Sequence, residues 1–419
     1  MKSSHLYPYG LAVLFAGTAV MPAVAQEDYF SRDRYTSVTE RTQPDFDPTI
    51  IRLGAFEARP ELRAGVGSRS NLFADDQNEV SDTFFILAPS LGLQTTWSRH
   101  QLGAQLEVNH REYQDTSEES KTDLAARVFG ELEASSQLSF TGAVTGSEKY
   151  EARSSAARVF DAAEPVQVNR LGGEAGVHYR ANRLKVDAGI GIDMIDYMDV
   201  SLRNGLIQDQ DFRDVDETVI KARTSWAMER DWAVFGEVVY IDRDYDAPVI
   251  AAALNRDSQG TIVRVGTDFE LSSLIRGDLA IGYQTFEYDD ARLSSVDGVS
   301  VEAELQWFVT QLTTLTGSAA RDISDPGLVG SAAVVETSVG VRADHELRRN
   351  WLIFGEVDVA NLDFETINRS DDRVNLGVGT TWKLNKNIWL DGSYRRIDQD
   401  SDVRSFDDNR FVVALRLFP

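Results

Sequence analysis

Three aspartates at alternate positions, Asp242, Asp244 and Asp246, come closest to a metal-binding motif in this sequence. They match the start of a calcium-binding loop, which needs a glycine next and a bidentate glutamate at its end. Alanine occupies both of those positions, at Ala247 and Ala253. The motif therefore fails. A solvated acidic loop, which could hold a divalent cation only loosely, is the better interpretation.

Residue combinations that carry out covalent catalysis are also missing from the sequence. It contains no nucleophile elbow, no phosphate-binding glycine loop and no zinc signature. The five histidines are scattered and cysteine is absent, so neither residue type predicts a cluster of ligands. We therefore expect no enzymatic activity, no metal site and no cofactor.

The charged residues show a different pattern, because many of them occupy alternate positions in otherwise apolar segments. Assigned to one face of each segment, they form a basic and an acidic sector. The basic sector comprises Arg63, Arg69, Arg111, Arg373, Lys383, Arg395, Arg410 and Arg416, and the acidic sector comprises Glu302, Glu304, Glu336, Glu356 and Asp358. Across a water-filled space, opposed charges create a transverse field that orders water and discriminates among solutes.

Local neutralisation is the alternative interpretation of these charges. In this view they pair with one another on the same or neighbouring segments and create no field across the space. Three pairs have a suitable spacing, namely Asp278 with Arg276, Asp344 with Arg342, and Asp391 with Arg395. Both interpretations remain open at this point.

Strands must position these charges, because apolar and polar residues alternate through most of the chain. Residues 184–194 are an example, with an apolar side chain at every even position. From about residue 61 onward, a unit of strand, short polar turn, strand and longer polar, often acidic, loop recurs. The short turns are 97–102, 133–138, 179–184, 228–232, 270–275, 308–312, 346–351 and 384–389. These eight turns join sixteen strands, and one further strand at each end gives about 18.

The aromatic residues distinguish a membrane barrel from a soluble sandwich with the same alternation. All seven tryptophans lie within about four residues of a short turn, namely Trp97, Trp226, Trp232, Trp307, Trp351, Trp382 and Trp389. Tyrosines fall mostly toward the long loops, and two aromatic bands are what the two interfaces of a membrane select. We therefore predict an all-β fold, a transmembrane antiparallel up-and-down β-barrel with short periplasmic turns and long acidic extracellular loops. The tryptophans would form its aromatic girdle.

The N-terminal part of the chain has a different character. Residues 1–25 have a basic start, a short apolar core and an Ala-x-Ala ending, which predicts a cleaved secretory signal rather than a membrane-spanning helix. Residues 26–60 lack alternation, and they predict a periplasmic extension, a partial plug or a disordered lead-in. The barrel domain would then span residues 61–419. The net charge of −25 argues against nucleic acid as a partner.

The last strand alternates to the end of the chain, with Phe411, Val413, Leu415 and Leu417 on one face. We expect this face to meet lipid, and the strand to pair with the first one so that no backbone edge is left unsatisfied. Phe418 falls out of phase, which predicts either a bulge near Leu417 or a Phe418 that caps the strand at the periplasmic rim. A terminal aromatic also resembles the signal read by the outer-membrane barrel assembly machinery. That machinery is an expected partner, together with outer-membrane lipid and lipopolysaccharide.

Residues 54–73, GAFEARPELRAGVGSRSNLF, together with the signal and the hairpin repeat, resemble the "putative β-barrel porin 2" family of Gram-negative outer-membrane proteins. The opening strand of that family runs through Ser-Asn-Leu-Phe into an acidic loop, as residues 70–73 do before Asp75 and Asp76. Several members belong to exopolysaccharide gene clusters. The resemblance therefore implies a channel that serves exopolysaccharide secretion, with polysaccharide export machinery as a partner, and it brings no site residues with it.

Two other functions fit the same sequence, namely a plugged structural or adhesive barrel and a general diffusion porin for small solutes. Aromatic side chains along the lumen would favour sugars, since sugar rings pack on aromatic faces. The candidates are Phe129, Phe235, Phe286, Phe354 and Trp389. A register shift of one residue would instead turn Phe235 and Phe354 toward lipid.

Overall fold

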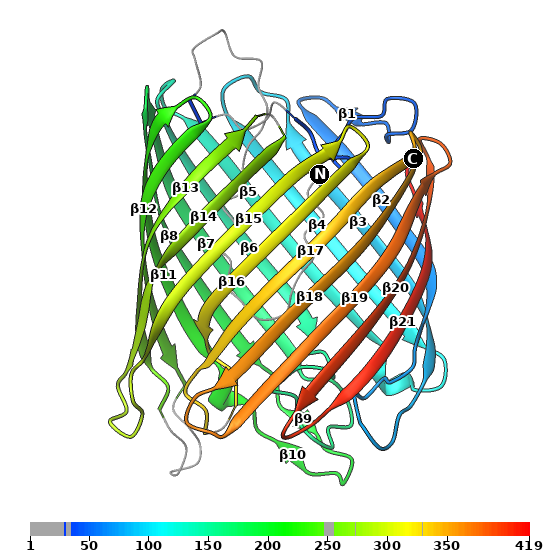
Figure 1. Cartoon of the computed structure of the whole chain (residues 1–419). Helices are drawn as coiled ribbons and strands as arrows, with labels where there is room; N and C mark the ends of the chain where they lie inside the picture. The colour runs from blue at the N-terminus through cyan, green and yellow to red at the C-terminus, as the bar shows by residue number, and fades with distance from the viewer. Residues whose placement is uncertain (1–28, 31–34, 247–254, 273, 329) are drawn as a thin grey trace.

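The computed structural model describes residues 29–30, 35–246, 255–272, 274–328 and 330–419, so the signal expected at residues 1–25 lies outside the described residues. The described residues form a ring of eighteen long antiparallel strands (Figure 1). In ring order these are β2 (Phe56–Arg69), β3 (Asp82–Thr95), β4 (Gln101–Tyr113), β5 (Lys121–Glu133), β6 (Leu138–Tyr150), β7 (Gln167–Ala181), β8 (Leu184–Tyr197), β11 (Val215–Glu229), β12 (Trp232–Tyr245), β13 (Ser258–Leu271), β14 (Ile275–Tyr288), β15 (Val296–Thr310), β16 (Thr313–Ser324), β17 (Val334–Arg348), β18 (Trp351–Phe364), β19 (Arg369–Lys383), β20 (Ile388–Ser401) and β21 (Phe406–Leu417).

The ring closes because β2 pairs with β3 on one side and with β21 on the other. Each remaining strand pairs with the strands before and after it in the ring, including β8 with β11. Each of the eighteen strands is therefore paired on both sides, as a bilayer requires of a structure that spans it. The predicted closed antiparallel barrel of eighteen strands is therefore confirmed. No helix among the described residues is long and apolar enough to span a membrane.

The two ends of the barrel differ in their connections, as the repeat predicted. Eight short turns lie at one end, and four of them have only two residues, among them Asn182 and Arg183 between β7 and β8. Asn182 adopts a φ of 52°, a conformation that asparagine tolerates better than most residues. The long loops at the other end contain β9 (Val200–Ser201), β10 (Ile207–Gln208) and the 3₁₀ turns Ser117–Glu119 and Asp211–Arg213. The short turns of outer-membrane barrels face the periplasm, and the C-terminus lies at that end (Figure 1).

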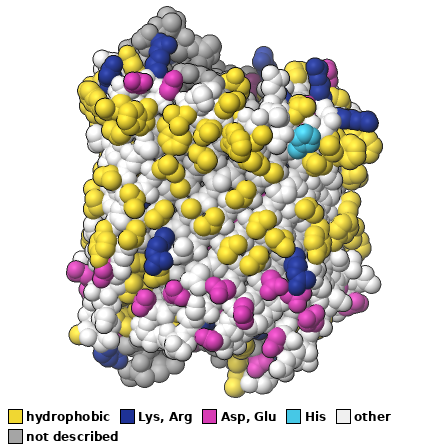
Figure 2. Space-filling model, viewed as in Figure 1, with side chains coloured by type: hydrophobic (Ala, Val, Ile, Leu, Met, Phe, Trp, Pro, Cys, Tyr) yellow, Lys and Arg dark blue, Asp and Glu magenta, His cyan; other side chains and the backbone are white. Residues whose placement is uncertain are grey.

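Side chains alternate between the two faces of the barrel wall. Large apolar side chains such as Val66, Val128 and Phe411 point outward and are exposed. Figure 2 shows such residues as a belt on one face of the barrel, with acidic residues gathered at its long-loop edge. An exposed apolar belt is typical of a surface that lipid covers, so the polar alternate positions face the lumen.

The barrel begins earlier than the sequence predicted. β2 begins at Phe56 rather than at residue 61, so residues 56–60 belong to the wall and not to the N-terminal extension. Pro60 suggested a break but is tolerated within the strand, because β21 pairs with β2 only from Leu62 onward and leaves that edge free. The short strand β1 (Ile51–Leu53) folds back onto β2 through Gly54, whose φ is 63°.

The last strand ends at Leu417, and its pairing with β2 and β20 shows no register shift. The Phe418 N–H donates to the carbonyl of Asn387 at 2.8 Å. Its ring packs against Trp389, with the centroids 5.0 Å apart. Of the two predicted alternatives, Phe418 therefore caps the strand at the short-turn rim, and no bulge forms.

Candidate functional site

The inward face of the barrel carries the charged residues of both predicted sectors. In each strand concerned, the charged residues alternate with residues that point outward and are exposed. Val66, Val374 and Phe411 show this for the strands of the basic sector. Val299 and Val357 show the same for the acidic sector. The period-two pattern thus assigns these charges to the lumen.

Most residues of the basic sector are ion-paired with nearby carboxylates. The pairs, with N···O distances of 2.5–3.4 Å, are Arg69 and Arg410 with Asp408, Arg111 with Asp123, Lys383 with Asp47, Arg395 with Glu356, and Arg416 with Asp391. Arg373 donates to the side chain of Gln399 at 2.6 Å. Arg63 has neither an ion pair nor a hydrogen bond within the described residues. Local neutralisation therefore accounts for most of this sector.

The acidic sector is also largely paired. Glu302 contacts Arg264 (3.1 Å), Glu304 accepts a hydrogen bond from Gln306 (3.3 Å), and Glu356 contacts Arg342 (2.8 Å). The carboxylate of Asp358 packs directly against the backbone of Gly340 on the neighbouring strand. Glu336 has no hydrogen bond or ion pair in the described part of the chain. Arg264 also contacts Glu237 and Asp322. Glu302 therefore belongs to a network that links β12, β13, β15 and β16.

The partners differ from two of the three pairs that spacing suggested. Arg342 and Asp344 do pair, at 2.9 Å. Asp278 instead contacts Arg223 of β11 at 2.6 Å, and Asp391 contacts Arg416 of β21 at 2.7 Å. Arginine side chains are long enough to reach across neighbouring strands. Distance along one strand is therefore a poor guide to pairing in the lumen.

The aromatic residues predicted in the lumen pack against glycines of adjacent strands. The pairs are Phe129 with Gly103, Phe235 with Gly266, Phe286 with Gly260, and Phe354 with Gly379, where a Cβ on the glycine would approach the ring within 2.2–2.4 Å. Arg223 and Arg342 cover the rings of Phe235 and Phe354, at 3.4 and 3.9 Å from the ring centroids. Neither ring faces lipid. Phe235 and Phe286 are buried in the wall, whereas Phe129 and Phe354 are half-buried with Arg127 and Arg342 over their rings.

Six of the seven tryptophans lie on the outer face near the short turns, with 38–49% of each residue exposed: Trp97, Trp226, Trp232, Trp307, Trp351 and Trp382. Trp389 departs from the predicted girdle and points into the lumen. Its Nε1–H donates to the carbonyl of Phe46 at 3.0 Å, and Lys383 lies over its ring. The reason is parity, because Tyr394 faces outward on β20 and residue 389 has the opposite parity.

Residues 35–50, here called the periplasmic segment, lie against the inner wall at the short-turn end. The segment contacts inward-facing residues from β14 to β20. Its ion pairs are Glu40 with Arg276 (3.3 Å), Arg41 with Glu346 (3.0 Å) and Asp47 with Lys383 (3.0 Å). The Val38 N–H also donates to the hydroxyl of Thr314. The segment therefore occupies part of the lumen next to these strands.

The Ser-Asn-Leu-Phe residues lie at the seam where β2 meets β21. Asn71 is fully buried, and its side chain donates to the carbonyls of Asp75 (2.7 Å) and Asp407 (3.0 Å). Its backbone N–H donates to Asp408, the buried carboxylate that also pairs with two arginines. The motif therefore joins the last strand to the first and turns the chain into the first long loop.

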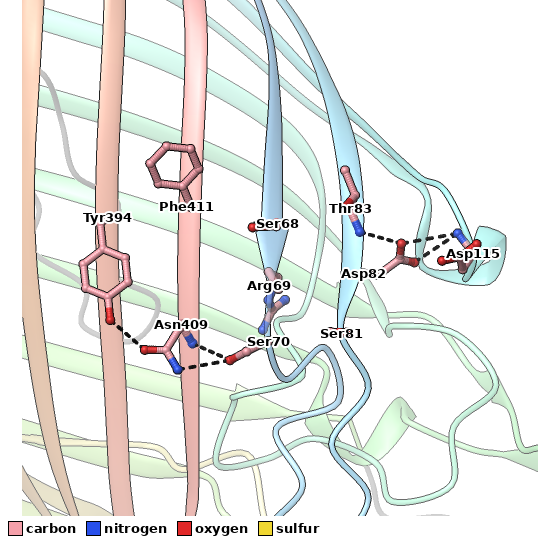
Figure 3. A pocket seen from close by; sticks show the side chains of 10 residues that line it. All are labelled: Ser68, Arg69, Ser70, Ser81, Asp82, Thr83, Asp115, Tyr394, Asn409 and Phe411. Atoms are coloured by element: carbon pink, nitrogen blue, oxygen red, sulfur yellow. Dashed lines mark hydrogen bonds between the residues drawn. The ribbon is translucent and has the colours of Figure 1, made fainter.

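The outer side of the same seam carries a cavity of about 410 Å³ near the long-loop end (Figure 3). Ser70 accepts a hydrogen bond from the Asn409 N–H at 2.8 Å, and Asn409 accepts one from the Tyr394 hydroxyl at 2.7 Å. Asp82 accepts from the backbone N–H groups of Thr83 and Asp115. Polar groups at this cavity are thus already bonded to one another and hold the closed seam.

The loop of residues 151–166 between β6 and β7, here called the crossing loop, spans the long-loop mouth of the barrel. Four of its backbone carbonyls accept hydrogen bonds from arginines, at 3.1–3.3 Å. Arg404 donates to the carbonyls of Arg153 and Ser155, Arg373 donates to that of Ser154, and Arg369 donates to that of Ala156. β6 and β7 are fifth and sixth in the ring, whereas β19 is sixteenth, so these bonds join nearly opposite walls. Ser155 and Ala157 are buried. The loop therefore narrows the lumen at this end.

Six arginines lie in the crossing loop or against it, and we call them the arginine cluster: Arg153, Arg158, Arg203, Arg369, Arg373 and Arg404. Arg153 pairs with buried Glu119 at 2.5 Å. Arg158 donates to the carbonyl of Phe73, whose ring lies near Arg153 and Arg203. Burial, followed by the charges of Arg158, Arg369 and Arg373, lowers the pKa of Arg404. Positive charge is therefore concentrated where the lumen is narrowed.

The family model of "putative beta-barrel porin 2" matches residues 43–418. The chain belongs to this family. This porin is therefore a β-barrel channel of the outer membrane, and its family points to a channel rather than an enzyme.

Solved structures similar to this porin include proteins of two Pseudomonas species. OccK2 (OpdF) of Pseudomonas aeruginosa in complex with glucuronate is 12% identical, with a TM-score of 0.46 over 86% of this chain and 98% of that chain. A BenF-like porin from Pseudomonas fluorescens Pf-5 is 11% identical, with a TM-score of 0.46 over 87% and 99%. OpdK of Pseudomonas aeruginosa is 13% identical, with a TM-score of 0.46 over the same shares. No curated protein sequence matches this chain.

The sequence reasoning missed the crossing loop of this porin and the arginines that hold it. Seven of the sixteen residues 151–166 are alanine or serine, whereas other long loops are richer in bulky polar residues. Small side chains allow a loop to pack closely against its surroundings, so this composition was the available signal. Loop residues have no periodicity that assigns them to a face, and Arg153, Arg158 and Arg404 were therefore not considered.

Proposed function

We propose that this porin is a passive channel for small hydrophilic solutes, narrowed at its extracellular mouth by the crossing loop. The observation that carries the proposal is the set of hydrogen bonds from Arg369, Arg373 and Arg404 to the carbonyls of the loop. A backbone held from both walls divides the mouth. Ions and small solutes can pass beside the loop, but a wide polymer could pass only if the loop moved out of the mouth.

Exopolysaccharide secretion, which the sequence resemblance implied, makes different demands on the lumen. A polysaccharide chain needs an undivided mouth and aromatic faces on which sugar rings can stack. The rings of Phe235 and Phe286 are 5% and 0% exposed, so they offer no such faces. These observations favour small solutes as cargo over a polymer.

The surroundings of this porin form part of the same proposal. The exposed apolar belt supports outer-membrane lipid as its environment, with lipopolysaccharide in the outer leaflet. The C-terminal strand, capped by Phe418, supports the barrel assembly machinery as the partner that inserts the protein. Crosslinking during assembly would test that partner directly.

Conductance of the refolded full-length mature protein in planar bilayers tests the proposed function. We expect stepwise ionic conductance, and swelling of proteoliposomes in arabinose but not in a long dextran. Absence of conductance would indicate the plugged structural barrel. Passage of the dextran would indicate a route wide enough for a polysaccharide, and would overturn the small-solute proposal.

A further inference from the structure

The arginine cluster carries an inference about substrate class, which rests on the function proposed above. We propose that the cluster binds small solutes bearing a carboxylate or phosphate group as they pass the crossing loop. The chemistry shared by these solutes is an oxyanion. The planar guanidinium of arginine matches an oxyanion with two parallel hydrogen bonds.

Some arginines of the cluster are paired with carboxylates and others are not. Glu119 pairs with Arg153, and Asp371 pairs with Arg369 at 2.6 Å. Arg158, Arg203 and Arg404 have no ion pair in the part of the chain that the structure describes. Asp75 and Asp161 are close enough to Arg158 to offset part of its charge, but they form no ion pair with it. Three guanidinium groups therefore remain without a contacting carboxylate.

Arg404 has a donor that lacks an acceptor. The residue is 8% exposed, and its terminal nitrogens donate to the carbonyls of Arg153 and Ser155. Its Nε and the Nε of Arg158 are buried and find no partner among the described residues. Leaving a buried donor unpaired is costly, and an arriving oxyanion would supply the acceptor. The guanidinium keeps its charge at neutral pH, so the site stays cationic.

A solute can reach the cluster, because several of its members are accessible. Arg203 is exposed, Arg158, Arg369 and Arg373 are half-buried, and only Arg153 and Arg404 are buried. Nearer the periplasm, Arg63 on β2 lies beside Arg416 on β21 and has no ion pair within the described residues, whereas Arg410 and Arg416 are paired with Asp408 and Asp391. Rings of basic side chains are the usual device of anion-conducting pores. In a chain with a net charge of −25, the three arginines without a contacting carboxylate are a local exception.

Ion selectivity provides the first test of the inference. Reversal potentials in a KCl gradient would be compared for the wild-type protein, Arg158→Gln, Arg203→Gln and Arg404→Gln. We expect the wild type to prefer chloride, and each variant to lose that preference severalfold. Arg396→Gln is the matched control, because Arg396 is paired with Asp398 on the outer face and lies away from the lumen. Since Arg203 is exposed, Arg203→Gln keeps the test valid if the variant of buried Arg404 fails to fold.

Titration with inorganic phosphate and with acetate distinguishes the two sources of the oxyanion. Each probe should reduce the chloride current of the wild type at lower concentration than in the three variants, and the more effective probe identifies the preferred group. Two results would overturn the inference and leave the proposed function intact. One is a conducting wild type that prefers potassium, and the other is an ion selectivity that is the same in the wild type and the three variants. A barrel that does not conduct would end the proposed function. Titration calorimetry with phosphate in detergent would then decide the inference alone, and absence of saturable binding would refute it.

Discussion

Two segments enter the lumen of this porin from opposite ends, and they are held in different ways. The crossing loop is continuous with barrel strands on both sides, and its backbone carbonyls accept hydrogen bonds from arginines of the far wall. The periplasmic segment is continuous with the barrel on one side only, through β1. It is held mainly by side-chain ion pairs, and one partner of each is partly exposed.

This difference indicates which constriction belongs to the fold and which one is docked onto it. Removing a buried anchor of the crossing loop leaves orphaned carbonyls or an unpaired charge inside the protein, which costs free energy. Releasing the periplasmic segment leaves charges that water can reach, at little cost. We therefore expect a permanent restriction at the extracellular mouth and a removable one at the periplasmic mouth.

Shortening the crossing loop should have the largest effect on conductance. Replacing residues 154–158 by two glycines removes three of the carbonyls and the backbone that divides the mouth. We expect single-channel conductance to rise severalfold in planar bilayers, with loss of anion preference because Arg158 is removed and the loop no longer packs against Arg404. An unchanged conductance would show that the restriction lies elsewhere in the lumen.

Deleting the periplasmic segment, residues 35–50, should raise conductance by a smaller factor. The segment lies along the wall from β14 to β20, so the rest of the mouth stays open when it is present. Heat-modifiable migration on gels should be unchanged, because no strand of the ring is touched. A larger increase than the loop variant gives would reverse the proposed order of the two constrictions.

Matched carboxylate substitutions compare the anchors of the two segments directly. Glu119→Ala leaves Arg153 buried and unpaired, which should cost about 3–5 kcal/mol. Glu346→Ala leaves Arg41 with 35% of its side chain exposed, which should cost at most about 1 kcal/mol. Urea unfolding measures the global cost, and trypsin cleavage after Arg158 reports local release of the loop. Equal costs would contradict the distinction between built-in and docked segments.

The barrel itself could be predicted because a strand pattern of period two survives in the sequence. Alternation assigned the inward charges, and the eight short turns set the strand number. The start of β2 was placed too late, because Pro60 looks like a break unless the free edge beside it is known. Trp389 was assigned to the girdle by its distance from a turn, whereas its parity on β20 turns it inward.

The site was less predictable, because it depends on which distant segments meet. Nothing in the sequence indicates that Arg404 contacts the backbone at Arg153, since their loops are far apart in the chain and about a third of the ring apart in the barrel. Similarly, Asp391 could pair with Arg395 or with Arg416, and only the arrangement of β20 beside β21 favours the second. Loop contacts and side-chain partners therefore needed the folded structure.

Salt should release the periplasmic segment but not the crossing loop, which is the smallest of the expected effects. The chain has no cysteine, so Ser37→Cys and Ser155→Cys each introduce a single thiol that reacts with a maleimide when exposed. Both serines are buried, at 6% and 2% exposure. Raising ionic strength from 0.1 M to 1 M shortens the Debye length from about 10 Å to about 3 Å, which weakens partly exposed ion pairs more than buried hydrogen bonds. Labelling at position 37 should therefore accelerate with salt while position 155 stays protected, and equal acceleration at both positions would show that the two segments are held alike.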